Sequence, residues 1–354
     1  MQHKLLLGST ALVSAGLLMS SGAQAQETMR VGGFEVVLGG YTEWGVSAAS
    51  RDTLTNSGNN RNYAFFMDNE VHIDANGATE SGILYGSHLE LEVGSGLGST
   101  DDAFVDEVGL YFSGNFGRFE FGQEDGANDV MGIGGADAQA GTGGIDGDTT
   151  NLLQFEDLDT GDVNKATYFT PRLAGFQLGA SWTPDSGTDA ASLEDDNGNF
   201  ENIIQGGVNW VGALGGLDLT VAATGIHGAV EPGVVGQDTD DLNSYSVGAL
   251  LGFGGFTLGA NAGQNLTNNT FENDFIAGGL KYGFGAANVS VGYVYNNPDE
   301  GDNANLFVAS GDVGLLPGVT LKGDVSYNDE DPGAHEDGET DDTFAGIVTM
   351  QLDY

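Results

Sequence analysis

The sequence predicts an all-β fold, and within that class a transmembrane antiparallel β-barrel of sixteen strands. Three observations favour it. Apolar residues alternate with period two from residue 29 onward, short and long connections take turns between the alternating segments, and glycine supplies 60 of the 354 residues. Alternation is the pattern of strands with two unlike faces. Glycine at this frequency disfavours helices, because each one costs a helix interior about 1 kcal/mol.

The first 25 residues have the pattern of a secretory signal peptide. Lys4 precedes an apolar run over residues 5–19, and Ala-Gln-Ala at 23–25 forms a cleavage site of small residues. The run is shorter than the roughly 20 residues that a spanning helix needs. We expect residues 1–25 to be removed after export and residues 26–354 to form one barrel domain in the outer membrane of a Gram-negative bacterium.

Sixteen alternating segments follow in chain order. An even number of antiparallel strands returns both chain ends to the periplasmic side, and closure removes the free sheet edges that would otherwise aggregate. We place the strands at residues 30–48, 61–75, 82–93, 104–114, 118–123, 164–170, 176–183, 202–212, 217–226, 244–253, 256–264, 273–284, 288–296, 304–313, 319–328 and 343–354.

The connections give the barrel two unlike ends. Short turns, such as 115–117 and 254–255, alternate with long stretches rich in Asp, Asn and Gly, such as 185–200 and 329–342. Tight periplasmic turns and long external loops are typical of outer-membrane barrels. Aromatic residues beside the short turns predict a girdle at the membrane boundary: Phe116, Phe119, Phe176, Phe253, Phe256, Tyr282 and Phe284. Trp44, Trp182 and Trp210 are expected to face outward.

Composition excludes several functions. The 52 acidic residues outnumber the 9 Lys and Arg, for a formal charge of −43, and phosphate binding needs a basic face, so nucleic acid is excluded as a partner. The absence of Cys excludes disulfides and thiol chemistry. The chain also lacks a G-x-S-x-G nucleophile motif and a Gly-Lys phosphate loop. We therefore predict that it is not an enzyme.

Alternation places many carboxylates on the inward face of the strands, against few basic residues. A water-filled passage lined by one sign of charge attracts ions of the opposite sign, so a preference for cations is expected. The inward acids are Glu35, Glu43, Asp68, Glu70, Asp74, Glu90, Glu92, Glu107, Glu120, Asp218, Asp324 and Asp353, joined by His72 and His88. The inward bases are Arg118, Lys165, Lys281 and Lys322, and Arg118 is expected to pair either with Glu120 or with periplasmic groups.

The segment 78–127, with its hairpin DEVGLYFSGNFGRFEFG and the long loop that follows, resembles the Rhodobacter-type general porins of alphaproteobacteria. The resemblance continues more weakly through ATYFTPRLAGFQLGASW to the terminal Tyr354. It implies a sixteen-stranded barrel, a homotrimer, and a third external loop that folds into the pore and constricts it. Here that loop would span residues 124–164, with Glu124, Asp125, Asp129, Asp137, Asp146, Asp148, Glu156, Asp157, Asp159 and Asp162 as its acids. The family sets such acids against a basic wall, whereas this chain has few bases.

We expect no cofactor and no built metal site. The acidic loops 143–151 and 193–202 could bind Ca²⁺ or other divalent cations loosely, and such ions could bridge them to lipopolysaccharide. His72 and His88, on adjacent predicted strands, are the sole pair that could join a zinc site, and polar wall residues in contact with water are the expected alternative.

Together these features predict a passive outer-membrane diffusion channel for ions and small hydrophilic solutes, embedded in lipid and lipopolysaccharide. One alternative stays open at this point. A secreted, Ca²⁺-stabilised, β-rich surface or adhesion protein would also have a signal peptide, acidity and Gly/Asp-rich turns.

Overall fold

The computed structural model describes most of the strands and turns and part of the longest connection. The described residues are 27–31, 33–50, 63–92, 104–143, 160–186, 200–230, 241–266, 273–298, 303–330 and 343–354. The predicted signal peptide lies outside them, as do most residues of the two acidic loops considered for loose cation binding.

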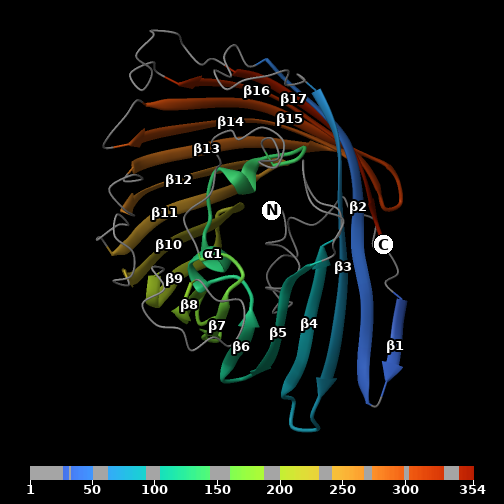
Figure 1. Cartoon of the computed structure of the whole chain (residues 1–354), viewed down its shortest axis with the longest axis vertical. Helices are drawn as coiled ribbons and strands as arrows, with labels where there is room; N and C mark the ends of the chain where they lie inside the picture. The colour runs from blue at the N-terminus through green and yellow to red at the C-terminus, as the bar shows by residue number, and fades with distance from the viewer. Residues whose placement is uncertain are drawn as a thin grey trace.

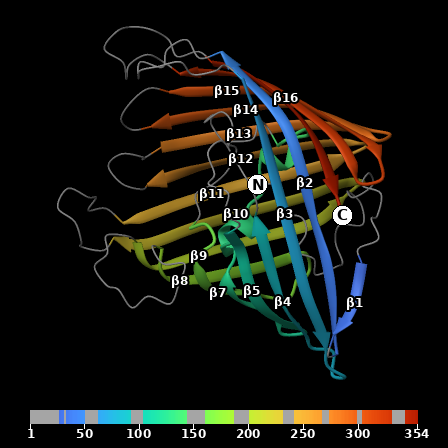
Figure 2. The ribbon, with the colours of Figure 1, turned by 45° about the vertical axis from the view of Figure 1, so that its right-hand side comes forward.

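Strands β2 to β17 form a closed antiparallel barrel, as Figures 1 and 2 show. Each strand pairs with the next one in the chain, and β17 pairs back with β2 from Phe344↔Ser50 to Asp353↔Tyr41. The sixteen-stranded barrel is therefore confirmed. In the first half the strands are β2 (Phe34–Ser50), β3 (Tyr63–Ala78), β4 (Leu84–Glu92), β5 (Phe104–Gly114), β6 (Gly117–Gln123), β7 (Asn164–Phe169), β8 (Phe176–Asp185) and β9 (Phe200–Leu214). In the second half they are β10 (Leu217–Val230), β11 (Leu242–Phe253), β12 (Phe256–Leu266), β13 (Asn273–Phe284), β14 (Ala287–Pro298), β15 (Ala304–Leu316), β16 (Val319–Glu330) and β17 (Thr343–Asp353).

A short strand that the sequence analysis merged with its neighbour precedes the barrel. Strand β1 (Glu27–Val31) pairs with the start of β2, from Glu27↔Leu38 to Val31↔Phe34. Gly33 makes the reversal possible with a φ of 94°, in the left-handed region that glycine adopts readily. The Tyr354 N–H donates to the Gly40 carbonyl at 3.0 Å. One edge of β2 is therefore covered by β1, Tyr354 and β17 in turn.

The two faces of the barrel have opposite character. Trp44 on the outer face is 49% exposed, whereas its neighbour Glu43, on the inner face, is 5% exposed. The same contrast separates Leu258, at 51%, from Thr257, at 6%. A soluble β-protein would bury the apolar residues and expose the acids. The alternative of a secreted surface protein is therefore wrong.

Aromatic side chains form two bands on the outer face. Beside the short turns, the ring centroids of Phe119 and Tyr168 lie 4.6 Å apart and those of Phe256 and Tyr282 4.4 Å apart. Near the opposite end, pairs such as Trp44 with Phe65, at 5.4 Å, and Tyr327 with Phe344, at 4.7 Å, make a second band that the sequence analysis did not name. Two such girdles are typical of transmembrane barrels.

The helices are short and lie in one place. Helix α1 (Ala127–Met131) and the 3-10 turn η2 (Ala136–Ala138) both belong to the connection between β6 and β7. Within the described ranges, no helix has the length and apolar character needed to cross a membrane.

Candidate functional site

The long connection between β6 and β7 lies inside the barrel. We call residues 124–163 loop 3; the structure describes 124–143 and 160–163 of it. Figure 1 shows α1 within the ring of strands. Helix α1 contacts β7 to β10, and η2 contacts β12 and β13. Residues 127–138 of loop 3 therefore follow the inner wall along β7 to β10 and along β12 and β13.

Small polar side chains on that wall bind the loop backbone. They accept hydrogen bonds from N–H groups that the irregular loop leaves without backbone partners. The bonds are Ala127 N–H to Ser181 Oγ at 2.7 Å, Gly135 N–H to Asn261 Oδ1 at 2.9 Å, Ala140 N–H to Ser290 Oγ at 2.8 Å and Thr142 N–H to Asp324 Oδ2 at 2.9 Å.

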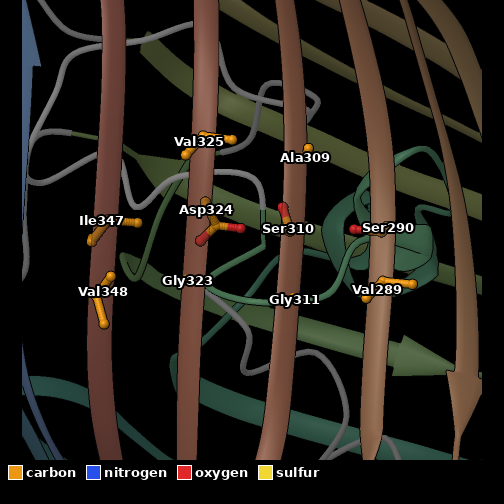
Figure 3. Close-up of a pocket in the computed structure, with 10 residues that line it drawn as sticks. All are labelled: Val289, Ser290, Ala309, Ser310, Gly311, Gly323, Asp324, Val325, Ile347 and Val348. Carbon is orange, nitrogen blue, oxygen red and sulfur yellow. The ribbon is translucent and has the colours of Figure 1, made fainter.

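The last two of these acceptors belong to a row across neighbouring strands. Ser290, Ser310 and Asp324 are register partners on β14, β15 and β16, and Figure 3 shows them side by side. Each has its side chain buried. The row places its acceptors where loop 3 passes. Asp324 therefore accepts a hydrogen bond from the loop backbone and does not line an open passage.

Glycine allows the loop to lie directly against the wall. A Cβ at Gly248 would lie 1.7 Å from the carbonyl oxygen of Ile133, and one at Gly259 would lie 2.2 Å from that of Gly134. Neither distance is sterically possible, so these wall positions need glycine because of close approach rather than backbone conformation.

Two lysines also hold the loop. Lys281 Nζ donates to the carbonyl oxygens of Asp137 at 2.9 Å and Gln139 at 3.2 Å. Lys165 Nζ donates to the carbonyl oxygens of Gly161, at 2.6 Å, and Glu124. Both residues were predicted as inward bases, and both bind loop backbone.

The wall formed by β2 to β5 is different: it is acidic. Register pairs bring Glu43 opposite Asp68, His72 opposite Glu90, and Asp74 opposite His88. A bulge between β4 and β5 matches Leu89 with Val108 but Leu91 with Val105. The side chains of Glu43, Glu70, His88, Glu90 and Glu107 are buried in this wall, whereas Asp68, His72 and Glu92 are half-buried.

Close contacts join these side chains. The Tyr41 hydroxyl lies 2.7 Å from both Asp68 Oδ2 and Glu70 Oε1. His72 Nε2 lies 3.0 Å from Glu70 Oε2 and 3.4 Å from Glu90 Oε2. The rings of His72 and His88 are 5.9 Å apart between centroids.

His88 sits at the centre of the remaining contacts. Its Nδ1 lies 2.8 Å from Asp74 Oδ1, and its Nε2 lies 3.3 Å from Glu90 Oε2 and 3.7 Å from Glu107 Oε2. Sequence analysis placed these residues on one inward face. It could not give their pairing, because register and the bulge decide which side chains meet.

The other two basic residues of the predicted lumen form ion pairs. Lys322 Nζ lies 2.8 Å from Glu43 Oε2. Arg118 pairs with Glu120, the partner expected from the sequence, and its guanidinium stacks 4.0 Å from the centroid of the Tyr111 ring. Both bases are therefore matched by acids on the wall.

Not every predicted inward acid lies in the barrel interior. Glu35 and Asp218 are exposed at the end that carries the short turns. Asp353, near the chain end, is half-buried. The remaining wall acids of β2 to β5 lie deeper along the strands.

The acids of loop 3 have several environments. Asp129 is buried, and Asp137 Oδ2 accepts a hydrogen bond from the Gly134 N–H at 2.7 Å. Carboxylate oxygens of Glu107, Asp125 and Asp162 lie within 4.8 Å of one another, a grouping that the sequence analysis did not find. Five acids predicted for the third loop lie outside the described residues: Asp146, Asp148, Glu156, Asp157 and Asp159.

The first two loop acids have perturbed acidity. Burial, followed by the charge of Glu120, raises the pKa of the Glu124 carboxyl to about 7. Burial and the charges of Asp129 and Glu107 raise the pKa of Asp125 above its ordinary value. Both shifts follow from removing a carboxylate from water and placing it beside others.

Known proteins share this architecture. The anion-selective porin from Comamonas acidovorans superposes with a TM-score of 0.68 at 17% identity, covering 91% of this chain and 100% of that one. A variant of the porin of Rh. blastica superposes with a TM-score of 0.62 at 16% identity, covering 90% and 100%.

Sequence comparisons agree. An uncharacterized protein of Rickettsia bellii is 23% identical over 298 residues, which cover 62% of this chain and 68% of the relative. A family model described as Gram-negative porin matches residues 8–333. The resemblance noted from the hairpin at 78–127 is therefore confirmed. The chain belongs to the Gram-negative porin family and is a channel protein of the bacterial outer membrane, not an enzyme.

Proposed function

We propose that this porin is a passive, cation-selective diffusion channel for ions and small hydrophilic solutes. One observation carries the proposal. The acidic wall of β2 to β5 faces loop 3, and the four predicted inward bases are engaged: Lys165 and Lys281 with loop carbonyls, and Arg118 and Lys322 with single carboxylates. The net field along the passage is negative, which concentrates cations and repels anions.

The anion-selective name of the Comamonas protein does not argue against this proposal. At 17% identity the two chains share a fold, whereas ion preference depends on the individual side chains that line a pore. The residues that decide selectivity here are acids.

A KCl gradient across a planar bilayer tests the proposal. Stepwise conductance with a zero-current potential of the sign for K⁺ permeation is the expected result. Discrete steps with the opposite sign would keep the channel and overturn its cation preference. The measurement needs EDTA in both chambers, so that bound divalent ions do not mask the wall charge.

We also propose that the mature protein begins after residue 25 and assembles as a homotrimer. The N-terminal pattern supports the first point, and the resemblance to Rhodobacter-type porins supports the second. Mass spectrometry of the mature N-terminus and sedimentation of the detergent-solubilised protein test them separately. An intact N-terminus or a monomeric species would overturn the respective point.

Loose binding of Ca²⁺ by the external acidic loops, bridging to lipopolysaccharide, belongs to the same proposal. Their excess of carboxylates supports it, since Ca²⁺ prefers oxygen ligands. Co-purification of lipopolysaccharide that falls when EDTA is added is the expected result. Lipopolysaccharide retained equally with EDTA would contradict a cation bridge.

A further inference from the structure

We propose that the inner wall of β3, β4 and β5 binds a divalent transition-metal ion such as Zn²⁺, with Glu90 as the shared ligand. Two overlapping sets of donor atoms meet there. Glu70, His72 and Glu90 make one set, and His88, Glu90 and Glu107 make the other. Within each set the donor atoms lie within 4.8 Å of one another.

The separations suit a small tetrahedral ion. With metal–ligand bonds of about 2.0–2.1 Å, two ligand atoms of a tetrahedral zinc lie about 3.3 Å apart. His72 Nε2 is 3.0 Å from Glu70 Oε2 and 3.4 Å from Glu90 Oε2. In the second set, His88 Nε2 is 3.3 Å from Glu90 Oε2 and 3.7 Å from Glu107 Oε2. Each set supplies three ligands and leaves a fourth position for water or a passing solute.

A second layer of contacts orients the donors. Asp74 Oδ1 lies 2.8 Å from His88 Nδ1, an arrangement that favours a proton on Nδ1 and leaves the Nε2 lone pair for the site. The Tyr41 hydroxyl lies 2.7 Å from Glu70 Oε1, while Oε2 is the oxygen nearest His72. Carboxylate–histidine pairs of this kind are typical of metal ligands, because they fix the tautomer and the ring orientation.

The donor types and the charge select the class of ion. The one imidazole and two carboxylates of each set suit Zn²⁺ and its first-row neighbours, whereas Ca²⁺ and Mg²⁺ prefer oxygen ligands throughout. Glu90 is 2% exposed, and Glu70, His88 and Glu107 are also buried. A divalent cation would compensate three carboxylates that the wall otherwise holds close together.

From the sequence we expected no built metal site, because the spacing of the two histidines does not indicate one. Histidines 16 residues apart on a strand pattern carry no ligand spacing of their own. The β3–β4 register places His72 opposite Glu90 and His88 opposite Asp74, and the bulge in β5 puts Glu107 beside them.

Equilibrium dialysis tests the inference on the full-length mature barrel in detergent. The protein is stripped with EDTA, freed of chelator and titrated with Zn²⁺, and in parallel with Co²⁺, whose visible absorption reports tetrahedral nitrogen and oxygen ligation. The double variant His72→Gln/His88→Gln is expected to bind at least tenfold more weakly and to lose the tetrahedral Co²⁺ spectrum. The variant Asp74→Asn, which keeps every ligand, is expected to lose about ten- to a hundredfold in affinity.

His227→Gln is the matched control. His227 also lies on a strand, where its Nδ1 contacts Asn243 Oδ1 at 2.8 Å, and its replacement should leave binding unchanged. Heat-modifiable migration on gels verifies that each variant has folded, and Asp74→Asn keeps the test available if the double variant does not fold.

Unchanged affinity in either the double variant or Asp74→Asn, or displacement of Zn²⁺ by equimolar Ca²⁺, would overturn the site. Binding is measured without a membrane, so a channel that conducts but binds no Zn²⁺ refutes this inference alone.

Discussion

Two parts of the barrel wall differ in a way that explains their roles. Strands β8 to β16 present serine, asparagine and glycine to loop 3, which covers them. Strands β2 to β5 present carboxylates and histidines that face across the interior. The covered wall is built for close backbone approach, and the acidic wall for electrostatics. Substitutions in the covered wall and in the acidic wall can therefore be studied separately.

The largest effect is expected where the covered wall is tightest. Gly248→Ala places a methyl 1.7 Å from the Ile133 carbonyl oxygen, so loop 3 must move away from the wall at this point. Overpacking of this kind costs about 1–3 kcal/mol of unfolding free energy. We expect faster proteolysis of loop 3 and a lower single-channel conductance, because the loop is pushed toward the passage.

Gly346→Ala is the matched control for that substitution. Its added methyl would meet its nearest neighbour, the Asp324 carbonyl oxygen, at 3.6 Å, an ordinary contact. Equal protease sensitivity of the two variants would mean that loop 3 does not depend on the glycine at 248.

The acidic wall should respond in selectivity instead. A unit charge at 4 Å contributes about 1 kcal/mol even in water, roughly fivefold in an equilibrium. Glu70→Gln/Glu90→Gln should therefore lower the K⁺/Cl⁻ permeability ratio about fivefold or more, with stability of loop 3 unchanged. The zero-current potential in EDTA measures it.

Acids at the exposed end provide the comparison. Glu35→Gln/Asp218→Asn removes the same number of charges where the side chains reach open water. We expect little change in the permeability ratio. An equal loss in both double variants would show that total charge, rather than the acidic wall, sets the preference.

The pH should shift selectivity through the first residue of loop 3. The Glu124 carboxyl, with its pKa of about 7, loses its negative charge as the pH falls from 8 to 6. Cation preference is therefore expected to weaken over this range, and Glu124→Gln should flatten part of the titration.

The same group predicts how stability changes with pH. A carboxyl whose pKa is raised in the folded protein binds its proton more tightly there than in the unfolded chain. Its contribution is fully present below the ordinary Glu value of about 4.3 and is lost as the pH rises through about 7. Chemical denaturation at pH 5 and at pH 8 measures the free energy of unfolding at each pH. The decrease between pH 5 and pH 8 should be smaller in Glu124→Gln than in the unmodified protein. An equal decrease in the two proteins would contradict the raised pKa of Glu124.

Salt is expected to have the smallest effect. The Debye length falls from about 10 Å at 0.1 M to about 3 Å at 1 M, so charges on a wide passage are partly screened. The K⁺/Cl⁻ ratio should decline gradually with salt at a fixed gradient. A ratio that is constant over this range would place the selective contacts in a narrower and drier section.

The sequence was sufficient for the strands and insufficient for the contacts between them. Alternation located the strands to within a few residues, because an outer apolar face and an inner polar face repeat every two positions. Strand β1 was missed because five residues next to a glycine turn give too short a pattern. Alternation also put His72, His88 and Glu90 on one face.

Contacts between distant segments needed the structure. Lys281 follows the inward alternation of its strand, yet it binds loop carbonyls more than 140 residues away in sequence. The glycines that seat the loop are indistinguishable, in sequence, from the many others in the strands. Close approach is a property of two segments together, so neither segment predicts it alone.

The covered edge of β2 has a consequence for biogenesis. The barrel closes only when residues 343–354 pair with β2, the strand whose first residues also pair with residues 27–31. A chain that lacks its last strand keeps a row of unpaired backbone groups, which is costly in lipid and prone to pair with other chains. The pairing of β2 with β17 therefore makes closure depend on both ends of the barrel: the first and last strands must both be present before the wall becomes continuous.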